Sequence, residues 1–349
     1  MRALALFLLA LTSAAQAEGS RSKSNRFIDP LDVAALQLAG ALQPEKQPLM
    51  AITAAGSRLV AVGFRGLIVL SDDAGKTWRQ AEVPVQTDLL SACFVSPKNG
   101  WVSGHDGVVL QTVDGGTTWQ RRLDNRLAKT AFPDFYRQKV DSGESGMQPF
   151  LDQVLQNTQN DSSLPYLSIL FENEQLGYAV GAFGVIATTA DGGASWTPAS
   201  HRIDNPKQLN LNAVRLIAGN VYIAAEQGLI FRLDRTRDRF VAVQTGYQGS
   251  FFDIIGNADY LLAYGLRGTA YRSVDRGLTW SKVDTASGTA LYGGAVLGDG
   301  TTAVLLSEAG EVLLSHDRGL SFKSSGLSTR SHVAGAFVAG SGEIISVGY

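Results

Sequence analysis

The residues that could carry chemistry are scattered through this 349-residue sequence and form no recognisable site. The four histidines stand singly, without the spacing of metal ligands: His105, His201, His316 and His332. Glu226 and Glu308 lie in predicted turns, but neither has the matched carboxylate partner that a glycosidase requires. Cys93 is the only cysteine, so it forms no intramolecular disulfide, and we expect it in the core. We therefore expect no enzyme, no metal and no cofactor.

One set of acidic residues does recur, in the pattern S/T-x-D-x-G-x-S/T-W/F that is known as an Asp box. Its aspartates are Asp73, Asp114, Asp191, Asp275 and Asp317. A sixth copy, Leu233 to Phe240, keeps only the aromatic position. Such an aspartate can accept backbone N–H bonds across a tight turn, while the glycine allows a left-handed backbone. Five copies spread along a chain cannot converge on one catalytic centre, so we interpret them as structural.

The spacing of these boxes predicts the fold. Their aromatic positions recur about every 41 residues, apart from one longer interval, and each period contains four short strand-like runs. A small antiparallel sheet of this size must stack on its neighbours to bury both faces. First strands begin near seven positions: Leu49, Leu89, Tyr166, Leu209, Ser250, Ala290 and Ser331. We predict an all-β, seven-bladed β-propeller of four-stranded antiparallel blades, with a helical insertion between blades two and three.

The chain divides into three parts on this interpretation. Residues 1–17 have the basic start, apolar run and A-x-A end of a signal peptide, with cleavage after Ala17. Residues 18–46 are expected to close the last blade, and residues 47–349 form the propeller, with the insertion at about 122–164. No later run is long enough to span a membrane. We expect a periplasmic or secreted monomer.

Charge and loop placement limit the partners. A formal net charge of −2 gives no field to attract nucleic acid, so we expect none. The insertion follows a fourth strand and therefore lies on the same face as the turns between second and third strands, where loops on a rigid scaffold can bind a protein. Candidate partner-binding residues on this face are Arg65, Arg267, Phe183, Phe135, Tyr136 and Arg137.

The insertion also contains a helical pattern. Met147, Phe150, Leu151, Val154 and Leu155 approximate the i, i+3, i+4, i+7 spacing of an amphipathic helix. Two interpretations stay open: a lid packed on its own propeller, or an element that docks a partner.

The repeats from Leu90 to Trp119 and from Leu167 to Trp196 resemble those of the photosystem II stability and assembly factor family. The resemblance covers about residues 47–349 and points to a non-photosynthetic bacterial relative. It implies a seven-bladed propeller that acts as a binding scaffold for membrane-protein subunits, without catalysis. Asp boxes also occur in sialidases and other glycosidases, so the alternative is a glycan-directed hydrolase or lectin.

Overall fold

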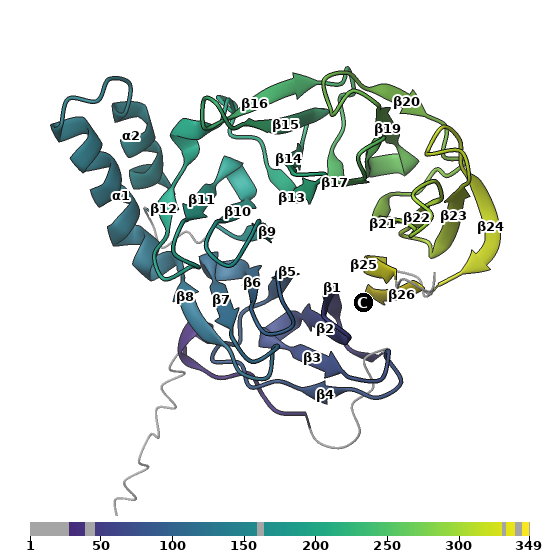
Figure 1. The fold of residues 1–349 in the computed structure, drawn as a ribbon. Helices are drawn as coiled ribbons and strands as arrows, with labels where there is room; N and C mark the ends of the chain where they lie inside the picture. Colours follow the sequence, from purple (N-terminus) through teal and green to yellow (C-terminus); the bar gives the residue numbers. More distant parts are fainter. Residues whose placement is uncertain (1–27, 39–45, 159–163, 330–332, 339–343, 349) are drawn as a thin grey trace, which may run out of the picture.

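The computed structural model describes residues 28–38, 46–158, 164–329, 333–338 and 344–348, which form small antiparallel sheets around a central channel (Figure 1). Six sheets have four strands each, paired in chain order from the channel outward. Sheet one contains β1 (Leu49–Ala55), β2 (Arg58–Gly63), β3 (Ile68–Ser71) and β4 (Arg79–Gln80). Sheet two contains β5 (Leu89–Phe94), β6 (Gly100–Gly104), β7 (Val109–Thr112) and β8 (Gln120–Leu123). Sheet three contains β9 (Tyr166–Phe171), β10 (Gly177–Gly181), β11 (Ile186–Thr189) and β12 (Thr197–Pro198).

The other three four-stranded sheets continue the ring (Figure 1). Sheet four contains β13 (Leu211–Ile217), β14 (Asn220–Ala225), β15 (Leu229–Asp234) and β16 (Arg239–Gln244). Sheet five contains β17 (Phe251–Gly256), β18 (Leu261–Gly265), β19 (Ala270–Ser273) and β20 (Ser281–Val283). Sheet six contains β21 (Leu291–Val296), β22 (Ala303–Ser307), β23 (Glu311–Ser315) and β24 (Lys323–Ser328).

The prediction of seven four-stranded blades is wrong, because the described residues form six. Between β21 and β1 lie two further strands, β25 (Val333–Val338) and β26 (Ile344–Gly348), which form a two-stranded sheet. The start counted near Ser331 identified a first strand, and a first strand does not require that three more follow. Residues 122–164 contain two helices: α2 (Gln148–Asn157) covers the amphipathic pattern expected at Met147–Leu155, and α1 (Asn125–Asp141) precedes it and was not expected.

The core lies between neighbouring sheets. Second strands such as β6, β10 and β18 are buried along their whole length, since each is covered by a sheet on both faces. One apolar cluster joins Val60 and Leu70 of sheet one to Val102 and Trp119 of sheet two. Similar clusters join sheets three and four, and sheets five and six. This stacking explains why the repeats alternate strand-like apolar runs with tight turns.

The recurring aspartates close the turn between the third and fourth strands of five sheets, and we call these the aspartate turns. In sheet one, Asp73 accepts hydrogen bonds from the N–H and hydroxyl of Thr77, at 2.8 and 2.6 Å, and from the Ser71 hydroxyl at 2.8 Å. The Ser71 hydroxyl oxygen also accepts the N–H of Gly75, whose φ is 89°. Hydrogen bonds from Thr77 and Ser71 lower the pKa of Asp73 to about 2.

Four of the five aspartate turns are also joints between sheets. In sheets two, three, five and six, the carbonyl before the turn glycine accepts a hydrogen bond from the preceding sheet. The pairs are Arg58 Nη1 to Gly115 O (3.0 Å), Trp101 Nε1 to Gly192 O (3.0 Å), Tyr222 Oη to Arg276 O (3.1 Å) and Arg272 Nε to Arg318 O (2.7 Å). The glycine itself must stay small, because a Cβ on Gly319 would lie 2.8 Å from Leu262 of sheet five. The turns therefore stabilise the ring as well as their own hairpins.

The described part of the N-terminal segment, residues 28–38, contacts sheet one, β8 and α1. Ala35 N–H donates to Val83 O at 2.9 Å, and Arg126 of α1 forms ion pairs with Asp29 and Asp32. None of the hydrogen bonds or ion pairs of residues 28–38 reaches β25 or β26. That residues 18–46 complete the last sheet stays a prediction, because residues 18–27 and 39–45 lie outside the described ranges.

Replacing Asp317 by alanine should lower the midpoint of thermal unfolding at pH 7 by about 2 to 4 °C, because Ser315 and Ser321 lose their acceptor. Burial raises the pKa of Asp317, but hydrogen bonds from Ser315 and Ser321 outweigh it and bring the pKa to about 2. A carboxyl pKa that is lower in the folded chain stabilises the fold above the unfolded pKa, and this contribution is lost as the pH falls through the folded pKa. The difference between variant and parent should therefore shrink below about pH 4 and vanish near pH 2.

Circular dichroism melts between pH 7 and pH 2 measure this difference. Asp259→Ala is the matched control, since Asp259 is an exposed aspartate of the β17–β18 turn whose carboxylate has no hydrogen-bond or ion-pair partner among the described residues. If both variants lower the unfolding midpoint equally, or if the difference in midpoint between Asp317→Ala and the parent does not change with pH, the carboxylate does not stabilise the turn.

Candidate protein-binding face

One end of the ring carries the turns between second and third strands together with α1 and α2, and we call it the helix face. Its turns include Phe64–Gly66, His105–Gly107, Ala182–Gly184 and Leu266–Gly268. Antiparallel strands alternate direction, so the aspartate turns lie at the opposite end of each sheet, which we call the aspartate face. The joints made by the aspartate turns therefore lie away from the helix face.

In sheets one to five, the residue before the turn glycine on the helix face has a left-handed backbone. The φ angles are 54° at Arg65, 56° at Asp106, 53° at Phe183, 53° at Gln227 and 56° at Arg267. Side chains other than glycine adopt this region at a cost, and surrounding contacts must hold them there. Two of those contacts come from the next sheet: Arg65 N–H donates to Asp88 Oδ1 at 2.8 Å, and Phe183 N–H donates to Asn210 Oδ1 at 2.7 Å. The turns are thus fixed, and their side chains project from a rigid frame.

The helices α1 and α2 pack on each other and cover part of sheet three (Figure 1). The first helix begins because the Asp124 carboxylate accepts the Leu127 N–H at 2.8 Å as an N-cap. Its inner side is apolar and contributes Phe132 and Tyr136 to a cluster with Leu151 and Val154 of α2. The helix pair is therefore packed on its own propeller by a continuous apolar contact.

The contact between α1 and sheet three centres on Tyr136 and His201. The Tyr136 hydroxyl lies 3.1 Å from His201 Nδ1, and the ring of Phe150 stacks on Tyr136 with centroids 5.9 Å apart. Burial, with Lys139 and Arg202 nearby, lowers the pKa of His201 to about 4, so the imidazole is neutral at pH 7. Burial raises the pKa of Tyr136 to about 12. Both groups are thus uncharged where they meet, as a buried contact requires.

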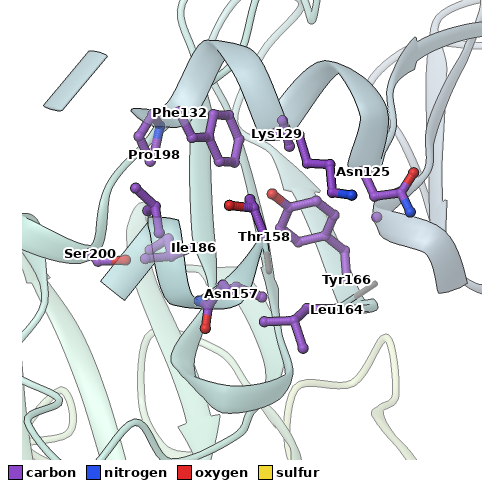
Figure 2. Close-up of a pocket in the computed structure, with 14 residues that line it drawn as sticks. Asn125, Lys129, Phe132, Asn157, Thr158, Leu164, Tyr166, Ile186, Pro198 and Ser200 are labelled. Carbon is purple, nitrogen blue, oxygen red and sulfur yellow. The ribbon is translucent and has the colours of Figure 1, made fainter. Parts of the chain in front are cut away.

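A small cavity remains under the helices, between α1, the end of α2 and sheet three (Figure 2). Phe132, Thr158 and Tyr166 point into it, and its volume is about 70 Å³. Binding sites for small molecules usually measure roughly 300 to 1,000 Å³. This cavity is therefore too small for a sugar or a peptide.

The structure separates the predicted partner-binding residues into two groups. Arg65, Phe183 and Arg267 are exposed, with Phe183 at 59%, but they come from sheets one, three and five and have no described contact with one another. Of the α1 residues, Tyr136 is fully buried and faces sheet three. Phe135 is half-buried beneath Lys139, whose ammonium lies 5.3 Å from the ring centroid, and Arg137 is exposed and paired with Asp134 at 2.7 Å. Partner binding by these residues stays a prediction.

Sequence reasoning missed two features. The first is a cleft of about 310 Å³ beside Arg267, whose lining includes Lys282, Thr285 and Ser287. A position-by-position comparison of sheet one with sheet five would have indicated it. The second is an ion pair inside the central channel, a space of about 400 Å³ lined by the first strands.

The channel contains an ion pair that joins three sheets. Arg215 of sheet four pairs with Asp253 of sheet five at 2.8 Å and donates to Ser168 Oγ of sheet three at 3.1 Å. No sequence pattern marked this pair. Cys93 lines the same channel, and burial raises the pKa of its thiol, which does not favour a reactive thiolate.

The described residues contain no group of three or more histidine, cysteine, aspartate or glutamate side chains able to hold a metal ion. Neither α1 nor α2 combines the length and the apolar character that a bilayer span requires.

Comparison with known proteins points to one family. The family described as photosynthesis system II assembly factor YCF48 matches residues 59–146. A photosystem II assembly protein Ycf48 of Synechococcus sp. is 28% identical over 172 residues, which are 45% of this chain and 49% of that protein. The photosystem II stability/assembly factor HCF136 of Cyanidioschyzon merolae is 34% identical over 83 residues, 22% of this chain and 19% of the relative. These findings support a photosystem II assembly factor-like family for this chain.

A solved structure of YCF48 bound to D1 peptide has the same fold. Its TM-score is 0.59 at 16% sequence identity, and the match covers 84% of this chain and 88% of that one. The curated relatives are matched over about half of their length or less. The chain is thus a β-propeller that is similar in sequence to Ycf48 over part of its length, and the relatives that it matches are assembly factors.

Replacing Tyr136 by alanine should release α1 and α2 from sheet three. Truncating a fully buried aromatic side chain costs about 3 kcal/mol, and local opening by that amount raises amide hydrogen exchange in α1 roughly 100-fold. Hydrogen-exchange mass spectrometry measures the change. Arg137→Ala, at the next and exposed position, should leave exchange unchanged. Equal exchange in the parent and Tyr136→Ala would mean that this contact does not hold the helices.

Proposed function

We propose that the chain is a non-enzymatic scaffold that binds a membrane-protein partner or an assembly intermediate through its helix face. The exposed side chains of the left-handed turns carry this proposal, because rigid turns present Arg65, Phe183 and Arg267 to solvent without using them in the fold. Phe183 offers an apolar contact and the two arginines offer charged donors, which are residue types enriched at protein interfaces.

The relatives support the same proposal. YCF48 has been solved with a D1 peptide, which shows that a propeller of this fold can hold a polypeptide. The class of partner, a membrane-protein subunit, follows from the resemblance to assembly factors. No partner of this chain is named by these comparisons, so the experiment must find it.

Capture from an envelope extract of the source organism tests the proposal. The tagged full chain should retain a defined membrane protein, and Phe183→Ala and Arg65→Ala should each reduce its recovery at least about tenfold. Alanine is compatible with a positive φ at both positions, since Ala74 of this chain has a φ of 58°. Val113→Ala, which truncates a 61% exposed side chain on the aspartate face, is the matched control.

Recovery that falls equally in the control, or in none of the variants, would contradict binding through the helix face. Deleting α1 and α2 would be a poorer test, because it would uncover apolar side chains of sheet three and could unfold the chain. Turnover of sialosides by the purified chain would instead favour the glycan-directed alternative.

We also propose that the chain is exported to the periplasm or beyond and processed after Ala17. The support is the sequence of residues 1–17, which lie outside the described ranges. Intact mass of the protein recovered from the periplasmic fraction should match a chain that begins at Glu18. Recovery of the full-length mass from the cytoplasm would contradict export.

A further inference from the structure

Sheets one and five are equivalent position by position on the helix face. From the end of the second strand to the start of the next sheet they align with no insertion or deletion, so that Arg65, Gln80 and Val85 correspond to Arg267, Lys282 and Ser287. The backbones agree as well. A Cβ on Gly66 would lie 2.0 Å from Val85 O, and a Cβ on Gly268 would lie 2.0 Å from Ser287 O. The groove bounded by these residues in sheet one therefore indicates what the corresponding groove of sheet five can bind.

In sheet one, this groove is filled by residues 34–38 of the chain itself. Ala35 N–H donates to Val83 O at 2.9 Å. The Gln80 amide holds the same stretch at two points: its Nε2 donates to Leu36 O at 2.8 Å, and its Oε1 accepts Leu38 N–H at 2.9 Å. Further along, Gln86 Nε2 donates to Ala34 O at 3.0 Å. The groove of sheet one thus binds a stretch of backbone through hydrogen bonds.

In sheet five, the corresponding groove is the cleft of about 310 Å³ beside Arg267. Lys282 replaces Gln80, so the cleft keeps a donor for a backbone carbonyl and gains a positive charge. Thr285 provides the carbonyl that corresponds to Val83 O. Gly288, which corresponds to Gln86, has open space within 4 Å of where a Cβ would lie. The cleft therefore offers the backbone positions that hold residues 34–38 in sheet one.

The charge of this cleft selects an acidic ligand. Among the described residues neither Arg267 nor Lys282 has an ion pair. The acidic residue of the lining is Asp284, whose Oδ1 already accepts the Ala286 N–H at 3.0 Å, and the nearby Glu311 carboxylate accepts the Ser287 hydroxyl at 2.8 Å. Both carboxylates thus accept hydrogen bonds from within the chain, whereas the two cations have no ion pair among the described residues, and exposed arginine suits bidentate binding of a carboxylate.

We propose that the sheet-five cleft binds an extended acidic segment of the partner protein, which lies along Lys282 to Gly288 as residues 34–38 lie along Gln80 to Gln86. A backbone carbonyl of the segment accepts from Lys282, an N–H donates to Thr285 O, and a carboxylate meets Arg267. The identity of the partner rests on the function proposed above, whereas the chemistry of the segment rests on the cleft.

Fluorescence anisotropy with a defined probe tests this inference on the full chain. The probe is a labelled ten-residue peptide with the sequence of residues 29–38 in which Gln37 and Leu38 are replaced by glutamate, and the unmodified peptide is the reference. We expect saturable binding of the acidic probe that is at least about tenfold tighter than that of the reference and weakens as salt is raised.

The double variant Arg267→Gln and Lys282→Gln should weaken binding of the acidic probe at least about tenfold. Both replacements suit their positions, because Gln227 adopts the same left-handed turn in sheet four and Gln80 occupies the position of Lys282 in sheet one. Arg276→Gln, which removes an exposed arginine from the aspartate face of the same sheet, should leave binding unchanged.

Absence of saturable binding to the parent chain, or equal binding by the parent and the double variant, overturns the inference. A parent that dimerises in sedimentation while the double variant does not would also overturn it, since the occupant would then be a second copy. If Phe183→Ala loses the captured partner but the double variant keeps it, the proposed function stands and the cleft proposal fails. If no helix-face variant loses the partner, the proposed function fails whatever the peptide does.

Discussion

The ring depends on the hydrogen bonds of the aspartate turn, because the same few atoms close a hairpin and join two sheets. Asp114 fixes the turn of sheet two by accepting from Thr118, and the carbonyl of the adjacent Gly115 accepts from Arg58 of sheet one. A change in the turn would therefore move the acceptor of the joint. In sheets two, three, five and six the aspartate turn therefore stabilises both its own hairpin and the contact with the preceding sheet.

The joints made by the aspartate turns lie at one end of the sheets, whereas the side chains at the other end vary. In sheets one to five the helix-face turns share a left-handed residue before the glycine, yet this residue is Arg65, Asp106, Phe183, Gln227 or Arg267. The connections that follow the fourth strands vary further, from the short stretch after β20 to the helix pair after β8. A surface whose backbone is fixed while its side chains differ between sheets is suited to recognising an irregular partner.

Much of the fold followed from the sequence, and the misses have physical causes. The first strands at Leu49, Leu89 and Tyr166 begin as predicted, because the alternation of apolar runs and glycine turns is a local property of the chain. The number of complete blades was wrong, since pairing of β26 with a further strand depends on distant residues. The buried position of Tyr136 was also missed. An amphipathic pattern shows that a helix has an apolar side but not which aromatic side chain packs against His201.

The surroundings of Arg65 and Arg267 could not be predicted from the sequence either. Arg65 and Arg267 look equivalent in the sequence, and their backbones are equivalent in the structure, but their surroundings differ. In sheet one the neighbouring groove is filled by residues 34–38, which hydrogen-bond to Gln80 and so satisfy its amide. In sheet five the groove is open and Lys282 stands in place of Gln80. A neutral amide, which can both donate and accept, suits a stretch of backbone held permanently by its own chain. An ammonium group donates only and carries charge, so it suits a ligand that brings a carboxylate and can leave again. One position in a repeated sheet therefore decides between a structural contact and a binding site.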